Sequence, residues 1–195
     1  MMKLDPQHLL YAYAQGIFPM AHESGQIFWY DPDPRAIIPL DQFHVPARLA
    51  RTVRQAPFDI RMDTAFRRVM EACAGTAPGR EETWISDELV TVYTELHRLG
   101  FAHSVEAWQD GVLVGGLYGV TLNSFFAGES MFSHERDASK VALVHLVRRL
   151  RQRNFLLLDI QFMTGHLAQF GAVEISRYEY KRRLSQALHR HNRFC

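Results

Sequence analysis

Hydrophobic residues recur at helical spacing in several segments of the first half of the chain. Asp5, Asp63 and Ser86 stand where an N-cap is expected, each directly before or at the start of such a segment. Gly16 and Gly100 follow two of the segments and are typical helix terminators. The predicted helices are 5–15, 46–54, 64–74 and 86–100, and a loop is expected over 75–82.

Alternation of hydrophobic and polar residues predicts strands elsewhere. "FDIRMD" alternates over 58–63, and three longer runs follow one another between residues 102 and 133. Asp110-Gly111 and Asn123-Ser124 separate these runs and are typical of tight turns, so we expect a three-stranded antiparallel meander. The stretch 17–35, rich in Pro, Gly and aromatic residues, favours irregular structure or short strands with turns.

The last third begins with a helix predicted from about Ser139, followed by the apolar "FLLLDIQFM", which reads as a strand buried on both faces. A short helix, a strand and a basic closing helix complete the chain. The fold class is therefore predicted to be α+β, with helices covering a mixed, largely antiparallel sheet. We expect a small N-terminal domain over 1–33 and a larger domain over 34–195.

Composition excludes several classes of protein. The chain has 195 residues, 47% of them hydrophobic, which is enough for a packed core. Cys73 and Cys195 make no disulfide framework and have no neighbours at metal-ligand spacing, so neither a metal nor a cofactor is expected. The sequence contains no export signal and no membrane-spanning run, and we expect a cytoplasmic protein without a membrane partner.

The net charge of +1 hides an uneven distribution. Residues 140–195 hold eleven Lys and Arg against three acidic residues, a net charge of +8, so the preceding residues carry −7. Such a basic segment fits a polyanionic partner such as nucleic acid. A solvated helix face balanced by acids elsewhere in the fold explains it equally well.

Three polar residues in apolar strands are candidates for chemistry. Glu129 lies within "GESMF", and Asp159 and Gln161 stand two residues apart on one face of "LLLDIQFM". A buried carboxylate has to be paired, solvated in a pocket or protonated, because desolvation of the ion is costly. Each one alone is more simply a satisfied core residue, but three in two strands favour a site. The sequence lacks the serine-hydrolase, zinc-protease, Walker and dinucleotide-binding signatures.

Longer blocks of sequence resemble the leucyl/phenylalanyl-tRNA protein transferases. They include "AYAQGIFPM", "WYDPDPRAIIPL", "LGFAHSVEAW", "FFAGESMFSHERDASKVAL" and "LLDIQFMTGHLAQFGAVEI", in the order of that family. The resemblance implies an aminoacyltransferase that moves Leu or Phe, with Met as a further candidate, from aminoacyl-tRNA to the α-amino group of proteins beginning with Arg or Lys. It also implies marking for N-end rule degradation, an abbreviated N-terminal domain before a GNAT-like domain, and a monomer.

The resemblance assigns roles to the polar residues. Glu129 matches the family's pocket glutamate, which would recognise a cationic acceptor by charge-assisted hydrogen bonds. Asp159 would accept the amine proton or orient the group that does, and Gln161 would position the amine or donate to the oxyanion. A neutral amide is too weak a base to act alone. The ester is already activated, so no covalent enzyme intermediate is expected.

Further residues are candidates for substrate contacts through the same resemblance. The substrate pocket is expected to involve Tyr13, Phe18, Met20, Trp84, Phe126, Ser130, Met131 and Leu143. Met20 stands where some relatives have Trp. The tRNA backbone is expected to contact Arg148, Arg149, Arg151, Arg153, Lys181, Arg182 and Arg183, with the helix bearing the first four favoured.

Two alternatives stay open. One is an RNA-binding or tRNA-binding module that keeps the fold without transfer. The other is a GNAT-like acyltransferase that uses acyl-CoA, although "HERDASK" stands where its pyrophosphate loop would be expected.

Overall fold

The computed structural model describes residues 4–22, 24–75 and 83–195, so most of the loop predicted over 75–82 lies outside the described residues. The helices are α1 (Pro6–Ala14), α2 (Ala47–Gln55), α3 (Phe66–Ala74), α4 (Asp87–Arg98), α5 (Ala138–Gln152), α6 (Gly165–Ala168) and α7 (Arg177–Leu188), with a 3-10 turn at Leu40–Gln42. The strands are β1 (Phe18–Ala21), β2 (Ile27–Tyr30), β3 (Arg35–Ile38), β4 (Asp59–Met62), β5 (Ala102–Gln109), β6 (Val112–Leu122), β7 (Phe125–Ser133), β8 (Leu157–Gln161) and β9 (Val173–Ile175).

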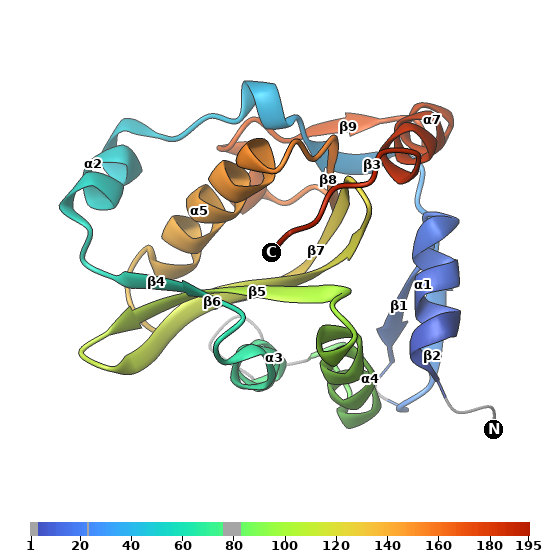
Figure 1. Ribbon diagram of the computed structural model, residues 1–195, viewed down its shortest axis with the longest axis horizontal. Coiled ribbons are helices and arrows are strands. Elements are labelled where there is room, and N and C mark those ends of the chain that lie inside the picture. Colours follow the sequence, from blue (N-terminus) through green and yellow to red (C-terminus); the bar gives the residue numbers. More distant parts are fainter. Residues whose placement is uncertain (1–3, 23, 76–82) are drawn as a thin grey trace.

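The main sheet has seven strands in the order β4-β5-β6-β7-β8-β3-β9 (Figure 1). Only the β7–β8 pair is parallel, with α5 connecting its two strands. The short strands β1 and β2 form a separate antiparallel hairpin. The predicted α+β class with a mixed, largely antiparallel sheet is confirmed.

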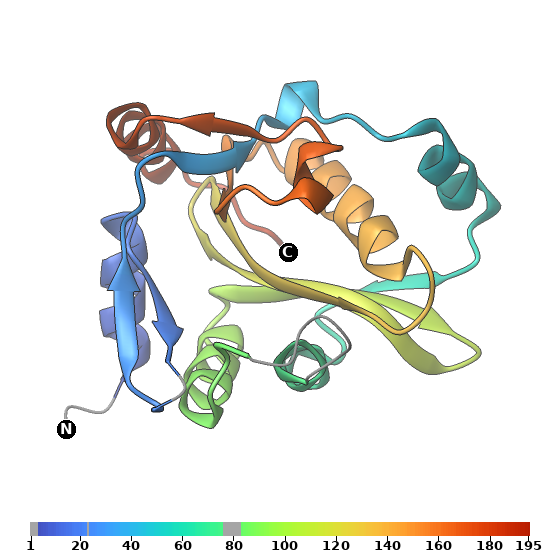
Figure 2. The same ribbon diagram turned by 180° about the vertical axis from the view of Figure 1, so that it is seen from behind.

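Two hydrophobic cores lie on opposite faces of this sheet. One packs α3 and α4 together with α1 and the β1–β2 hairpin, through residues such as Leu9, Val69 and Tyr93. The other packs α5 against the opposite face, through residues such as Val144 and Leu150. Figures 1 and 2 show α5 on one side of β5 and β6 and the pair α3 and α4 on the other. The C-terminal segment ends between α5 and the sheet, where Phe194 is buried.

Most predicted elements are present with shifts of one or two residues, including the meander β5–β7 and the doubly buried β8. The sequence did not predict β3, whose four residues are all buried and which lies between β8 and β9. The division at residue 33 stays a prediction.

The prediction that Asp63 caps the helix after it is wrong. Helix α3 begins at Phe66, and its preceding amides, those of Thr64 and Ala65, donate to the carboxylate of Glu106 at 2.9 and 2.8 Å. Asp63 instead accepts hydrogen bonds from His103 and from the Ser104 amide. A carboxylate from a neighbouring strand therefore replaces the local cap. None of the helices in the described ranges is long and apolar enough to cross a membrane.

Candidate functional site

Strands β7 and β8 diverge in the middle of the sheet, and the divergence opens a cavity. Their parallel pairing covers only Phe125–Ala127 against Leu157–Asp159, although both strands continue beyond it. At the same level, the pairing of β6 with β7 jumps from Tyr118↔Ser130 to Gly119↔Gly128. Glu129 is therefore the extra residue of a β-bulge, a feature that redirects a side chain out of the regular alternation.

A glycine on β6 makes this bulge possible. A Cβ atom at Gly119 would lie 2.2 Å from the carbonyl oxygen of Ala127 and 2.3 Å from the Phe126 ring. Only a residue without a side chain allows so close an approach of β7. The glycines of "GGLYG" thus serve backbone packing next to Glu129.

Gln161 lies opposite Glu129 at the end of β8. Its backbone has φ of +59°, which is uncommon for a residue with a side chain and occurs often at functional sites. Its amide Nε2 donates to Glu129 Oε1 at 3.3 Å. Its backbone N–H donates to Asp159 Oδ1 at 2.9 Å, which fixes the end of the strand.

The cavity has a volume of about 320 Å³ and is lined mostly by apolar side chains. Glu129, Ser130 and Gln161 are polar residues in its wall. Of the predicted substrate residues, Phe18, Met20, Trp84, Ser130, Met131 and Leu143 line it. The size and the few convergent polar groups are typical of a small-ligand pocket.

Burial raises the pKa of Glu129 to about 8, and the nearby Asp159 carboxylate adds to this shift. Hydrogen bonds from Tyr13 and Tyr93 and the charge of Arg35 act in the opposite direction. Tyr93 Oη donates to Glu129 Oε2 at 3.5 Å, and Tyr13 and Tyr93 share a hydrogen bond of 2.5 Å. The carboxyl group therefore changes its charge close to neutral pH.

Asp159 is fully buried and both of its oxygens are engaged. Arg35 binds it in a two-pronged ion pair, with Nε to Oδ1 at 2.9 Å and Nη2 to Oδ2 at 2.7 Å. Tyr180 also donates to Oδ2 at 2.9 Å. The Arg35 guanidinium lies between the rings of Phe18 and Tyr180 and donates to the Gly16 carbonyl. Asp159 thus joins β8, β3, α7 and the start of β1.

Two predicted pocket residues do not line the cavity. The Phe126 ring is buried and lies 5.6 Å from the Phe194 ring in the core beside α5. Tyr13 is buried behind Tyr93 and reaches Glu129 through that hydroxyl. The direct contact of Phe126 with substrate stays a prediction; its ring belongs to the core beside α5 and is not part of the cavity wall.

The structure also brings residues to the cavity that the sequence analysis missed. Tyr118 lines it with a buried hydroxyl that has no hydrogen-bond partner among the described residues. Its pKa is raised well above 10 by burial, so the hydroxyl stays protonated and available as a donor. The sequence signal was its place in β6, one residue before Gly119. Other lining residues are Leu117, Gly128, Leu146, Leu158, Ile160, Phe162, Thr164, His166 and Leu167.

The predicted tRNA-binding residues differ in whether their side chains already have partners within the protein. Arg149 Nε donates to the Phe194 carbonyl at 2.7 Å and Arg151 Nε to the Leu40 carbonyl at 2.6 Å, so both support the fold. Arg148 and Arg153 are exposed on α5 and after its end. On α7, Arg182 and Arg183 share Glu179, and Lys181 binds Asp31 at 3.0 Å.

A second basic group lies beside the cavity and was not predicted. Arg48, Arg136 and Lys140 surround the single carboxylate of Asp137 at 3.1, 3.9 and 3.2 Å. They line a shallow depression that shares His166 with the wall of the main cavity. Glu135 also lines this depression, so three cations face two carboxylates and leave a small excess of positive charge there.

Comparison with known proteins gives a consistent result over most of the chain. Residues 37–185 match the family described as leucyl/phenylalanyl-tRNA protein transferase, and residues 2–33 match the N-terminal domain of the same family. A leucyl/phenylalanyl-tRNA–protein transferase of Herpetosiphon aurantiacus is 64% identical over 187 residues, covering 95% of each chain. One from Phenylobacterium zucineum is 62% identical over 190 residues, covering 96% of this chain and 86% of the relative.

Similarity to solved structures is weaker. A ribosomal-protein-alanine N-acetyltransferase from Brucella melitensis biovar Abortus 2308 has a TM-score of 0.41 and 14% sequence identity, covering 57% of this chain and 84% of that one. A likeness of this degree supports no conclusion about activity. The sequence matches, in contrast, span both the hairpin region and the main sheet, and the chain belongs to the leucyl/phenylalanyl-tRNA protein transferase family.

Proposed function

We propose that the protein transfers Leu or Phe from aminoacyl-tRNA to the α-amino group of proteins that begin with Arg or Lys. The observation that carries this proposal is the cavity at the divergence of β7 and β8. It combines an apolar wall, suited to a Leu or Phe side chain, with Glu129 and Gln161, hydrogen-bonded to each other at its edge. In the cell, such transfer would mark acceptor proteins for N-end rule degradation.

Glu129 is the group that recognises the cationic acceptor. In the free protein its pKa is about 8, so most molecules carry this proton at neutral pH. An ammonium or guanidinium group in the cavity favours the ionised form, because an opposite charge at short distance lowers a carboxyl pKa. Acceptor binding therefore releases this proton to solvent and leaves a charge-assisted contact in the wall of the cavity.

Gln161 positions the reacting groups. Its side-chain NH2 can donate one hydrogen to Glu129 and the other to the acyl oxygen, and its carbonyl oxygen can accept a hydrogen bond from the attacking amine. The Tyr118 hydroxyl, protonated and without a partner among the described residues, offers a second donor for the developing oxyanion. The amine attacks the ester carbonyl, the tetrahedral intermediate collapses, and the ribose oxygen leaves with a proton.

Asp159 acts through Gln161 and not as the proton acceptor. Its oxygens already accept from Arg35, Tyr180 and the Gln161 amide, and it is fully buried. Each of its two oxygens accepts two hydrogen bonds, so no lone pair is left free and directed at the amine. Of the two roles that the sequence left open, the orienting one fits this geometry.

The amino-acid side chain occupies the apolar part of the cavity. Met20 of β1 and Phe162 after β8 line it together with Trp84. An unbranched Met adapts its shape more easily than an aromatic residue, and Met is therefore a candidate third amino acid. Discrimination between such side chains in an apolar pocket amounts to about 1 to 3 kcal/mol per methylene group.

The tRNA acceptor end approaches over the basic surfaces that flank the cavity. Arg48, Arg136 and Lys140 adjoin it through His166, and the exposed Arg148 and Arg153 extend the positive surface along α5. The α7 residues Lys181, Arg182 and Arg183 remain candidates at the other end. Contacts of this kind are with phosphates, which position a nucleic acid without reading its sequence. We further propose that the protein works as a monomer in the cytoplasm.

The decisive experiment measures transfer of labelled Leu and Phe from charged tRNA to peptides that differ only in their first residue. Product is expected with Arg and Lys and not with Asp, Glu or Ala. In the Glu129→Gln variant, transfer efficiency is expected to fall by about 100-fold, because loss of a desolvated charge pair costs roughly 2 to 5 kcal/mol. Glu174→Gln, which changes an exposed glutamate on β9 outside both the cavity and the basic depression, is the matched control and should keep full activity.

Other outcomes would favour the alternatives. Transfer to acidic peptides would keep the reaction but remove the role of Glu129. Binding of charged tRNA without any product would indicate a binding module. Product formed from acyl-CoA in place of charged tRNA would indicate an acyl-CoA-dependent acyltransferase.

A further inference from the structure

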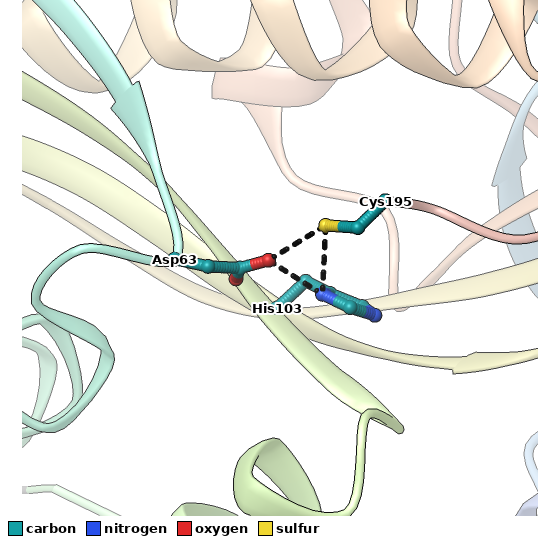
Figure 3. Close-up of side chains that lie close together, drawn as sticks. All are labelled: Asp63, His103 and Cys195. Atoms are coloured by element: carbon teal, nitrogen blue, oxygen red, sulfur yellow. Dashed lines mark hydrogen bonds and ion pairs between the residues drawn. The ribbon is translucent and has the colours of Figure 1, made fainter.

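Asp63, His103 and Cys195 form a cluster beside β4, β5 and the C-terminal segment (Figure 3), and none of the three lines the cavity. Asp63 follows β4, His103 lies on β5, and Cys195 is the last residue of the sequence. His103 Nδ1 lies 2.8 Å from Asp63 Oδ2, and Cys195 Sγ lies 3.0 Å from the same oxygen and 3.9 Å from Nδ1. Three different ligand atoms thus face one point.

This arrangement does not fit a cysteine nucleophile with a His–Asp pair. In such a triad the acid binds one ring nitrogen of the histidine and the nucleophile lies at the other. Here the carboxylate oxygen and the sulfur both lie closest to Nδ1 of His103. Convergence on one nitrogen is instead the geometry of ligands that share a cation.

We propose that Asp63 Oδ2, His103 Nδ1 and Cys195 Sγ bind one Zn²⁺ ion. Zinc takes oxygen, nitrogen and sulfur ligands at about 2.0 to 2.3 Å in a tetrahedral arrangement, which places neighbouring ligand atoms about 3.3 to 3.6 Å apart. The observed separations of 2.8, 3.0 and 3.9 Å lie within about half an ångström of that range, so small side-chain shifts would complete the site. On binding, the thiol gives its proton to solvent. The imidazole proton that Nδ1 donates to Asp63 in the free protein is exchanged through solvent for a proton on Nε2, so that Nδ1 can bind the ion.

The surroundings hold the three side chains in place. Asp63 has φ of +60°, and its second oxygen accepts from the Ser104 amide at 2.9 Å, which leaves Oδ2 directed at the cluster. The His103 ring stacks on the buried Phe194 at 4.5 Å, so the residue next to Cys195 is anchored in the core. Hydrogen bonds and packing that orient ligands in this way strengthen metal sites.

Access and charge are also compatible with an ion. Cys195 is exposed while His103 is buried and Asp63 is partly buried, so solvent reaches one side of the cluster and can supply the fourth ligand. Arg149 lies beside the C-terminal segment and donates to the Phe194 carbonyl. Burial and the Asp63 carboxylate raise the pKa of the Cys195 thiol, and the charge of Arg149 opposes this rise, so the bound ion itself has to stabilise the thiolate. A bound ion would join the end of the chain to β4 and β5.

The experiment uses the full chain freed of metal by a chelator and titrated with Co²⁺, which replaces zinc and is visible by absorption. One equivalent is expected to give thiolate-to-cobalt charge-transfer absorption together with the visible bands of four-coordinate cobalt. Cys195→Ser should lose the charge-transfer absorption, whereas Cys73→Ala should retain it, because Cys73 lies on α3 away from the cluster.

Calorimetric titration with Zn²⁺ tests the remaining ligands. Asp63→Asn and Cys195→Ser are each expected to weaken binding by at least about 10- to 100-fold, and Zn²⁺ should raise the melting temperature of the unmodified protein only. The proposal is overturned if charge-transfer absorption is absent, if it persists in Cys195→Ser, or if Asp63→Asn binds Zn²⁺ as tightly as the unmodified protein. Binding without a thiolate signal would be adventitious binding to surface histidines, and it also overturns the proposal.

Discussion

Burial raises the pKa of the Glu129 carboxyl group and hydrogen bonds lower it, and the effect of burial is the larger one. The residue combines three features: a bulged position, hydroxyl and amide partners, and a pKa of about 8. Asp159, only two strand positions away from Gln161, has the opposite environment because Arg35 neutralises it. Two carboxyl groups in the same part of the sheet therefore have different surroundings: Glu129 lines the cavity, and Asp159 is ion-paired with Arg35 between β8 and β3.

The raised pKa of Glu129 predicts a specific dependence of stability on pH. Its folded pKa of about 8 lies above the ordinary value of 4.5, so the folded protein binds this proton more tightly than the unfolded chain. The stabilisation by this proton is complete below about pH 4.5 and is lost as the pH rises to about 8. Glu129→Gln should therefore gain stability relative to the unmodified protein between pH 5 and pH 9.

Urea denaturation of both proteins across this range measures the effect. Each unit of pKa shift corresponds to about 1.4 kcal/mol, and the partial exposure of Glu129 to the cavity reduces the total. A difference in unfolding free energy that stays constant with pH would show that Glu129 titrates as an ordinary exposed carboxyl group. Glu174→Gln again serves as the control substitution.

At the scale of elements, the site depends on two adjacent irregularities of the sheet. The β7 bulge places Glu129, and the pairing of β3 with β8 shifts between Ala36 and Ile37, next to Gln161. Regular alternation would put Glu129 and its neighbours on fixed faces of the sheet. The irregularities therefore decide which side chains reach the cavity.

Replacement of Gly119 by Ala tests the bulge. The added Cβ would lie 2.2 Å from a backbone carbonyl oxygen, so β7 has to move away from β6. We expect a loss of about 1 to 3 kcal/mol in unfolding free energy, as for other overpacked positions, and a fall in transfer activity. Gly165→Ala is the matched control because its Cβ would meet nothing within 4 Å, and it should be close to neutral. Equal stability of both variants would contradict the role of Gly119.

The ion pair between β3 and β8 supports a second prediction at this scale. Asp159→Asn leaves the Arg35 guanidinium buried without its counter-charge, so we expect a loss of about 3 to 5 kcal/mol in unfolding free energy. Glu174→Gln on the neighbouring β9 changes an exposed acid and should shift stability by less than about 0.5 kcal/mol. Thermal and urea denaturation measure the unfolding free energy of both variants. A loss below about 1 kcal/mol in Asp159→Asn would show that the Arg35–Asp159 ion pair contributes little to stability.

At the scale of the whole molecule, basic side chains are concentrated on α5, on α7 and in the depression that Arg48 of α2 lines beside the cavity. Residues 140–195 carry a net charge of +8. This charge attracts an anion only at those Lys and Arg side chains that are not already paired with acidic residues of the fold. Arg149 and Arg151 bond to backbone carbonyls, so part of the basic segment supports the fold. The structural interpretation of the charge pattern thus holds for these two residues, and contact with a polyanion stays a prediction for the others.

Binding of charged tRNA should therefore depend most on the basic group next to the cavity. The double substitution Arg48→Ala with Lys140→Ala is expected to weaken binding by about 10-fold or more and to reduce the dependence of affinity on salt, because two phosphate contacts are lost. Arg148→Ala with Arg153→Ala removes the same charge from the distal end of α5 and is the comparison. A larger effect of the distal pair, measured by filter binding at two salt concentrations, would move the tRNA path along α5.

The sequence by itself determined the helices, the meander, the buried β8 and the three polar residues of the site, because each leaves a local pattern of spacing, capping or burial. The order of the longer motifs was also enough to predict the family, and the family matches over 2–33 and 37–185 confirm it. Only the tertiary structure decided the rest. The partner of Asp159 lies 124 residues away in a strand that the sequence did not predict, and the cap of α3 comes from Glu106 on another strand. The bulge at Glu129 depends on the pairing register between strands. The cluster of Asp63, His103 and Cys195 depends on how the C-terminal segment packs against the sheet. Neither feature leaves a local periodicity in the sequence.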